Sequence, residues 1–335
     1  MIKERDGMRF VKILLCFLAL FACLAFFGGC SEEEEAPQED IYYKVVFDSA
    51  GGSSTDEIKV LSGSKIARPE DPEKEGYIFN GWRKDAVEWD FANDKVTSDL
   101  TLTAGWIDAK TIFDYEIADG KATLTKYKGK LDSIRIPTQI AGYPVVAIGD
   151  EAFMSTAYEK TQEITVGENI KVIGSSAFAG CAGIRLTLEC KPVSIGEKAF
   201  AGCTALGKIT LGSGLTAIPV EAFLGCTGLE SVILSDTTET VGENAFDGCT
   251  ALKSVTAHSS LKTVSDSAFL GCSSLKAIYY YGTAEQWAQT QIAEGNNGND
   301  TLMGAYFYMY SEAEPPKDAK GKYWYFKDDG SIRIW

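Results

Sequence analysis

Apolar residues return at a fixed interval along the second half of the chain. An Ala-Phe pair recurs with its phenylalanines 22 to 25 residues apart, at Phe153, Phe178, Phe200, Phe223, Phe246 and Phe269. A Gly-Cys pair follows all but the first of them, with its cysteine three residues after the phenylalanine, at Cys181, Cys203, Cys226, Cys249 and Cys272. A fixed period in this range predicts a solenoid, in which each repeat forms one coil.

Each repeat ends in a short segment where apolar and polar residues alternate. In residues 206–211, Ile209 and Leu211 alternate with Lys208 and Thr210. This alternation predicts a strand with one apolar face, since successive side chains point to opposite faces of a sheet. One repeat cannot bury that face alone, so stacked copies must form the core. Gly202 leads into the strand at a turn where a positive φ is expected.

The repeated phrase has the form I-G-x-x-A-F-x-G-C-x-x-L-x-x-I-x-L, and it resembles the BspA-type leucine-rich repeat. Pro219 and Ser265 depart from the glycine after the first aliphatic residue, and residues 184–188 are one residue short. The resemblance implies a mostly β fold, a leucine-rich-repeat solenoid. Its expected parts are a lead-in or N-terminal cap at 107–145, the repeats at 146–283 and a C-terminal cap at 284–335.

The C-terminal cap is expected to begin with a short helix over residues 284–293. Residues 295–300 are rich in Gly and Asn and predict a loop. They lack the alternating acidic ligands that a calcium loop needs. Aromatic residues at 306–308 and 323–326 are expected to cover the last repeat, although an exposed aromatic binding patch is the alternative.

A separate pattern of short strands and turns occupies residues 41–106. Residues 44–47 form an apolar strand before a Gly-Gly turn, and residues 76–82 read Gly-Tyr-Ile-Phe-Asn-Gly-Trp. Together with Trp89, Phe91 and Trp106 they resemble the internalin-type B repeat, a small β-grasp module. We expect its three tryptophans to form the core rather than a carbohydrate platform, because so small a module needs large side chains to fill its interior.

The N-terminus has the pattern of a secretory leader. A basic start is followed by an apolar run over residues 13–27 that is shorter than a membrane span. Residues 27–30, Phe-Gly-Gly-Cys, resemble the lipobox of bacterial lipoproteins, so Cys30 is the expected lipidation site and residues 1–29 the signal peptide. Cys23 is a competing position, and an ordinary cleaved leader would instead release a secreted protein. Residues 30–40 are an acidic tether, because four consecutive glutamates follow Ser31.

Composition narrows the function further. The formal net charge is −15, which argues against nucleic acid as a partner because phosphate binding needs clustered Lys and Arg. His258 is the only histidine, so a Ser/His/Asp or Cys/His site would have to be built on it alone. The period-locked cysteines predict a packed ladder of free thiols, although neighbouring strands are close enough for disulfides. The sequence therefore predicts no catalytic residue, no metal site and no cofactor.

The resemblance implies a lipid-anchored protein at the cell surface or outer membrane that acts in adhesion, binding a protein on a host or neighbouring cell. Alternatives are a non-catalytic structural display stalk and a glycan-active enzyme. Residues between the buried positions of each strand must point outward. The predicted partner-binding residues are Lys208, Thr210, Ser231, Ile233, Ser254, Thr256 and Tyr279.

Overall fold

The computed structural model describes residues 40–154, 161–293, 298–312, 315, 321–327 and 332–335. Apart from Asp40 and Ile41, these residues belong to one compact unit, Tyr42–Trp335. Strands dominate the unit, and the described residues form only three short α-helices, which are α1 (Ala109–Ile112), α2 (Ala284–Trp287) and α3 (Asp300–Met303). The predicted mostly β fold is confirmed.

The first part of this unit is a five-stranded sheet with the order β2-β1-β5-β3-β4. β1 and β5 are parallel, although 51 residues separate the end of one from the start of the other. Trp82 and Trp89 are 1% and 8% exposed, and Phe47 packs edge-on against Trp82 at 5.0 Å, so two of the three tryptophans fill the core as expected. Trp106 is half-buried and packs against that core. The strands are β1 (Tyr42–Asp48), β2 (Ile58–Leu61), β3 (Tyr77–Lys84), β4 (Val87–Glu88) and β5 (Leu100–Asp108).

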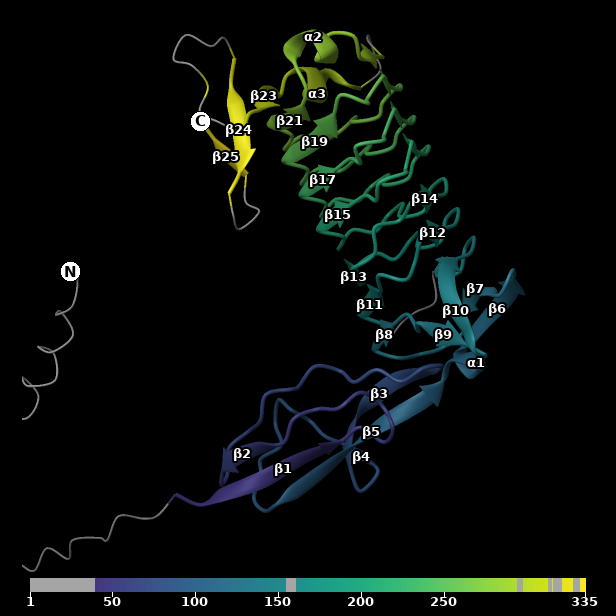
Figure 1. Ribbon diagram of the computed structural model, residues 1–335, viewed down its shortest axis with the longest axis vertical. Helices are drawn as coiled ribbons and strands as arrows, with labels where there is room; N and C mark the ends of the chain where they lie inside the picture. The colour runs from purple at the N-terminus through teal and green to yellow at the C-terminus, as the bar shows by residue number, and fades with distance from the viewer. Residues whose placement is uncertain (1–39, 155–160, 294–297, 313–314, 316–320, 328–331) are drawn as a thin grey trace, which may run out of the picture. The chain divides into compact units, whose positions relative to one another are not determined.

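A β-hairpin then covers the first coil of the solenoid (Figure 1). Its strands are β6 (Phe113–Ala118) and β7 (Lys121–Tyr127), and its turn is the Asp119-Gly120 pair. Asp119 and Gly120 both have positive φ, 50° and 69°, as a two-residue hairpin turn of this kind requires. β7 pairs in parallel with β10 (Tyr143–Ile148), which also pairs with β9 (Gln139–Ile140).

The coils of the solenoid stack through two series of short parallel strands (Figure 1). The first series follows the sequence-predicted strands. Its members are β8 (Ser133–Arg135), β11 (Glu163–Val166), β13 (Arg185–Leu188), β15 (Lys208–Thr210), β17 (Ser231–Ile233), β19 (Ser254–His258), β21 (Ala277–Tyr281), β23 (Tyr306–Tyr310), β24 (Tyr323–Phe326) and the antiparallel β25 (Ile332–Ile334). The second series is β12 (Val172–Ile173), β14 (Ser194–Ile195), β16 (Ala217–Ile218), β18 (Thr240–Val241), β20 (Thr263–Val264) and β22 (Gln291–Ile292).

Both series are interrupted at the same repeat. β13 and β15 belong to separate sheets, as do β14 and β16. This is the place where the chain departs from its period, since residues 184–188 are one residue short. The strand face is therefore divided into two sheets, because a shortened coil cannot keep its strands in register with the next coil.

The recurring phenylalanines form a continuous stack through the core. Neighbouring rings from Phe153 to Phe269 lie 5.1–5.5 Å apart with interplanar angles of 2–17°. Tyr127 of the hairpin begins the stack, 5.6 Å from Phe153. All six phenylalanines are 0–1% exposed. The repeat frame predicted from the sequence is thus confirmed.

Each coil turns through a left-handed residue that the sequence did not reveal. The residue before every Ala-Phe pair has a φ of 52–57°, and none of them is glycine: Glu151, Ser176, Lys198, Glu221, Asn244 and Ser267. Left-handed backbone is unfavourable for most such residues, so the stacked coils must hold it in place. In one example the N–H of Lys198 donates to the carbonyl of Val220 in the next repeat. Gly202 has the expected positive φ, 75°.

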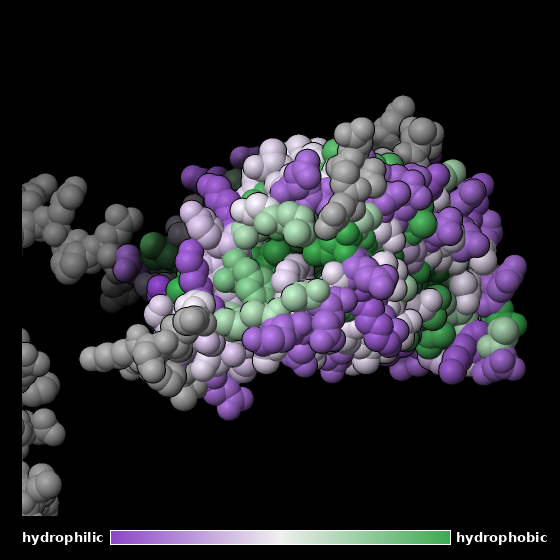
Figure 2. Space-filling view, turned by 90° about the horizontal axis from the view of Figure 1, so that it is seen from above, coloured by the Kyte–Doolittle hydropathy of each residue, from purple (hydrophilic) through white to green (hydrophobic). Residues whose placement is uncertain are grey.

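The stack of coils continues beyond the last complete phrase. The helix expected over residues 284–293 is limited to α2, because the chain then enters β22, which pairs in parallel with β20. Seen from the α2–α3 end, apolar surface gathers in the middle of the face and polar surface surrounds it (Figure 2). Leu270 and Met303 are 43% and 57% exposed, so apolar side chains are accessible in this part of the chain.

The side chain of Asn299 caps the last repeat through hydrogen bonds to its backbone. In the inner repeats the N–H of each stacked phenylalanine donates to an alanine carbonyl of the next coil, as Phe246 does to Ala268 at 2.8 Å. Phe269 has no such coil after it, and its N–H donates instead to Oδ1 of Asn299 at 3.2 Å. The Asn299 amide donates to the carbonyls of Ser265 and Ala293 at 3.0 and 3.2 Å. Its side chain therefore replaces backbone that a further repeat would supply.

Candidate functional site

The outward positions of the first strand series form straight rows. One row runs Lys208, Ser231, Ser254, Ala277 and Tyr306, and the next runs Thr210, Ile233, Thr256, Tyr279 and Tyr308. Between them Ile209, Val232 and Val255 point into the core and are 1–2% exposed. The predicted residues are therefore brought together in the register that the repeat frame implies.

The C-terminal end of these rows is covered in part, which corrects one predicted binding position, Thr256, whereas Tyr279 is half-buried. Thr256 is only 2% exposed and cannot present its side chain to a partner. Tyr279 stacks on Tyr308 at 5.5 Å and packs against Trp324 at 5.4 Å. Trp324 is itself 0% exposed, so β24 lays an aromatic ring over the outward face of β21. Tyr279 is therefore part of the C-terminal cap, and its burial raises the pKa of its phenol.

The remaining predicted positions are open to solvent. Lys208 is exposed, and the other four are half-buried: Thr210, Ser231, Ile233 and Ser254. Ile233 is the large aliphatic member of an otherwise polar group. The accessible part of the predicted face thus spans β15, β17 and the start of β19.

The repeat cysteines form hydrogen bonds that bind successive coils together. Each thiol donates to the carbonyl of the phenylalanine one repeat earlier, at 3.1–3.3 Å, as Cys226 does to Phe200. That same carbonyl also accepts the backbone N–H of its own repeat's cysteine, here Cys203. The five period-locked cysteines are buried and free, as predicted: Cys181, Cys203, Cys226, Cys249 and Cys272. Cys190, which lies outside the period, is also buried and free.

Burial makes these thiols poor nucleophiles. It raises the pKa of Cys190 to about 11, and it raises the pKa of Cys181, Cys226 and Cys272 to about 12. Only the thiolate reacts quickly with electrophiles, so thiols of this kind are inert in the folded chain.

Thiol labelling tests this arrangement. We expect the five repeat thiols to react slowly with an alkylating reagent in the native chain and almost completely after denaturation without reductant. Mass spectrometry of the labelled peptides gives the extent at each position. Two or more repeat cysteines that need reductant before they react would contradict the free ladder and indicate disulfides.

His258 does not form part of a catalytic arrangement among the described residues. Its ring stacks on Tyr281 at 4.4 Å with an interplanar angle of 8°. Burial lowers the pKa of His258, although Asp236 acts in the opposite direction. His258 is consequently a neutral, half-buried member of the aromatic cluster at the end of the solenoid. The described residues also contain no group of three or more His, Cys, Asp or Glu that could hold a metal ion.

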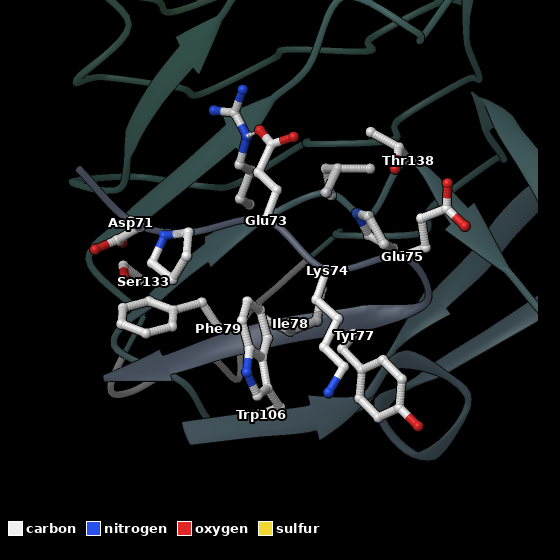
Figure 3. A pocket seen from close by; sticks show the side chains of 14 residues that line it. Asp71, Glu73, Lys74, Glu75, Tyr77, Ile78, Phe79, Trp106, Ser133 and Thr138 are labelled. Atoms are coloured by element: carbon white, nitrogen blue, oxygen red, sulfur yellow. Dashed lines mark hydrogen bonds and ion pairs between the residues drawn. The ribbon is translucent and has the colours of Figure 1, made fainter. Parts of the chain in front are cut away.

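A hollow of about 220 Å³ lies where the five-stranded sheet meets β8 (Figure 3). Arg135 is held by two carboxylates, with its Nε 2.9 Å from Glu73 and its Nη2 2.7 Å from Glu189. The Lys74 ammonium lies over the rings of Tyr77 and Trp106 at 4.8 and 5.6 Å. Lys74 thereby covers one face of each of these rings. The hollow depends on loops far apart in the sequence, so periodicity could not predict it.

Comparison with known proteins agrees with the repeat geometry. The BspA type leucine rich repeat region matches in six copies over residues 125–237 and 193–291. The chain belongs to the BspA-type leucine-rich-repeat family. A Listeria-Bacteroides repeat domain matches residues 43–105 of this BspA-type protein, which is the five-stranded module. These two matches confirm the family resemblances that the sequence showed.

Sequence relatives match only parts of this BspA-type chain. Internalin H of Listeria monocytogenes is 35% identical over 103 residues, which are 29% of this chain and 18% of internalin H. Two further relatives, from Evansella cellulosilytica, carry names that describe membrane proteins. The chain spans less than a fifth of the length of these curated relatives.

Solved structures with similar folds are also bacterial. A leucine-rich cell surface protein of Faecalibacterium prausnitzii is 26% identical with a TM-score of 0.49, and the match covers 67% of this chain and 59% of that one. The leucine-rich-repeat protein of T. pallidum is 28% identical with a TM-score of 0.46, covering 50% and 79%.

The predicted lipidation site, Cys30, lies outside the described residues, as do the competing Cys23 and the apolar run over residues 13–27. Within the described ranges, none of the helices has the length and apolar character of a membrane span.

Proposed function

We propose that this chain is a lipid-anchored bacterial surface protein that binds a protein partner through the open strand face of its solenoid. The observation that carries the proposal is the accessible group on β15, β17 and β19, in which Ile233 lies among polar side chains in regular rows. Stacked strands of this kind offer an extended surface for binding. Cell-surface placement is supported by the names of the relatives and by the lipobox-like residues at Cys30.

The proposed role is binding rather than catalysis. The thiols are buried with raised pKa values, and the single histidine is stacked in an aromatic cluster. An enzyme needs a nucleophile or a general base that reaches its substrate. These groups lack that access, which supports binding over catalysis by a thiol or a histidine.

Ile233→Asp tests the proposed face. We expect binding of the mature chain to its partner, selected from a panel of purified extracellular-matrix proteins and glycans, to weaken at least about tenfold, because a charge would replace the apolar contact at the centre of the face. The midpoint of thermal unfolding should hardly change. Surface plasmon resonance gives the affinity.

Ala217→Asp is the matched control, since Ala217 is an exposed strand residue of the second series. Equal weakening by Ala217→Asp would contradict the proposed face. Hydrolysis of a glycan would favour the enzyme, and failure of every panel member to bind would favour the display stalk. Tyr279→Asp is unsuitable for this test because Tyr279 packs inside the cap.

A further inference from the structure

One edge of the five-stranded sheet presents an apolar pair beside two lysines. Tyr42 of β1 and Leu61 of β2 are register partners, and they are 57% and 39% exposed. Lys44 and Lys59 are the partners two residues further along the same two strands, and both are exposed. The Lys44 ammonium pairs with the exposed Glu57 carboxylate at 2.6 Å, so Lys59 supplies most of the positive charge of this edge. Because alternate residues share a face, all four side chains lie on the outer face of the β1–β2 edge.

The outer face of these strands is exposed to solvent, whereas their opposite face belongs to the hydrophobic core. Val45 and Val60, on the opposite face of the same strands, are 0% and 9% exposed. Sequence position adds a second observation. β1 begins at Tyr42, which lies twelve residues after Cys30 in the sequence. A fully extended segment of that length reaches at most about 40 Å, so a lipid on Cys30 would keep Tyr42 within that distance of a bilayer.

We propose that the edge patch formed by Tyr42, Leu61, Lys44 and Lys59 rests on the surface of the bilayer that holds the lipid anchor. This inference rests on the lipid anchor at Cys30 that is part of the proposed function. Tyrosine is favoured at the membrane–water boundary, where its ring is apolar and its hydroxyl stays hydrated. Lysine beside it is attracted by anionic lipid headgroups.

A bilayer suits this patch better than a protein partner does. Two apolar side chains are too few for a stable protein interface, which buries hundreds of Å² from each side. A short tether allows even so small a patch to bind the membrane, because it raises the local concentration of the patch to about the millimolar range. Charge also favours one orientation. The chain carries −15 overall, so an anionic surface repels most of it and attracts Lys59 on this edge, whereas Glu57 offsets the charge of Lys44.

Lysine labelling on vesicles tests the patch. A mature chain beginning at Cys30 is coupled through that thiol to a maleimide-bearing lipid in phosphatidylcholine vesicles containing about 30% phosphatidylglycerol. The described cysteines are buried, so coupling is directed to Cys30. Acetylation of each lysine is followed by mass spectrometry. We expect Lys59 to react at least about threefold more slowly on vesicles than in solution, with Lys84 and Lys208 unchanged, and we expect high salt to remove the difference.

The double variant Tyr42→Asp with Leu61→Asp should restore fast labelling of Lys59. Val87→Asp, at a position 71% exposed on the opposite edge strand β4, should leave the slow rate intact. Unchanged labelling of Lys59 on vesicles, equal slowing at Lys84, or slow labelling in the double variant would overturn the proposal. Chemical coupling supplies the anchor in every sample, so these outcomes do not depend on whether cells lipidate Cys30.

Discussion

Phe223→Ala is expected to lower the free energy of unfolding by about 3–5 kcal/mol, the usual cost of replacing a buried phenylalanine by alanine. Phe223 is 0% exposed and lies between Phe200 and Phe246 at 5.3 and 5.1 Å, with all three rings nearly parallel. The substitution therefore removes two stacking contacts and leaves a cavity that the rigid coils on either side cannot close. Denaturant titration followed by circular dichroism measures the change.

The damage should remain partly local, because each coil contacts only its neighbours. Hydrogen exchange is expected to accelerate in the coils that contain Phe200, Phe223 and Phe246, and to stay unchanged in the five-stranded module. Leu224→Ala is the adjacent control, since Leu224 is only half-buried. A loss below about 1 kcal/mol for Phe223→Ala would contradict its place in the stack.

Cys30→Ala is expected to abolish lipid attachment and to leave the chain either uncleaved or soluble. The acyl chains of a lipoprotein are joined to the cysteine that follows the cleaved leader, so alanine leaves no atom to carry them. Stable anchoring needs more than one acyl chain, and the substitution removes the residue that carries them. Detergent phase partition and the mass of the mature chain report the result.

Cys23→Ala is the comparison that separates the two candidate positions. We expect it to leave both anchoring and mature mass unchanged. A lipid-bearing chain of mature size in Cys30→Ala, together with its loss in Cys23→Ala, would move the lipidation site to Cys23.

The repeated phrase was sufficient to predict the core because each of its positions has one environment. Phe223, Cys226 and Leu229 recur with the period, and each is 0% exposed. Stacking makes one repeat a template for all of them, so local alternation in residues 206–211 also predicted which side chains point outward. The small module was predicted from its strand and turn residues, and the match to the Listeria-Bacteroides repeat domain agrees.

Features that depend on contacts outside the period could not be predicted. Trp324 is 45 residues from Tyr279, and only the parallel pairing of β23 with β24 brings the two rings together. The burial of Thr256 is equally invisible to alternation, which places it outward. The left-handed residues escaped notice because Lys198 and Glu221 have side chains that rarely adopt such backbone. Asn299 lay in a stretch whose composition predicts only a loop.

Asn299 has a consequence for how the array changes in length during evolution. Its side chain recognises the N–H of the last phenylalanine and two backbone carbonyls, and not the particular side chains of the last coil. Every repeat presents an equivalent phenylalanine N–H to whatever follows it. Duplication or deletion of a whole repeat by recombination would therefore deliver an equivalent phenylalanine N–H and backbone carbonyl to the same asparagine, while the Ala293 carbonyl comes with the cap itself. The number of repeats in the solenoid could therefore change during evolution while the C-terminal cap stays the same.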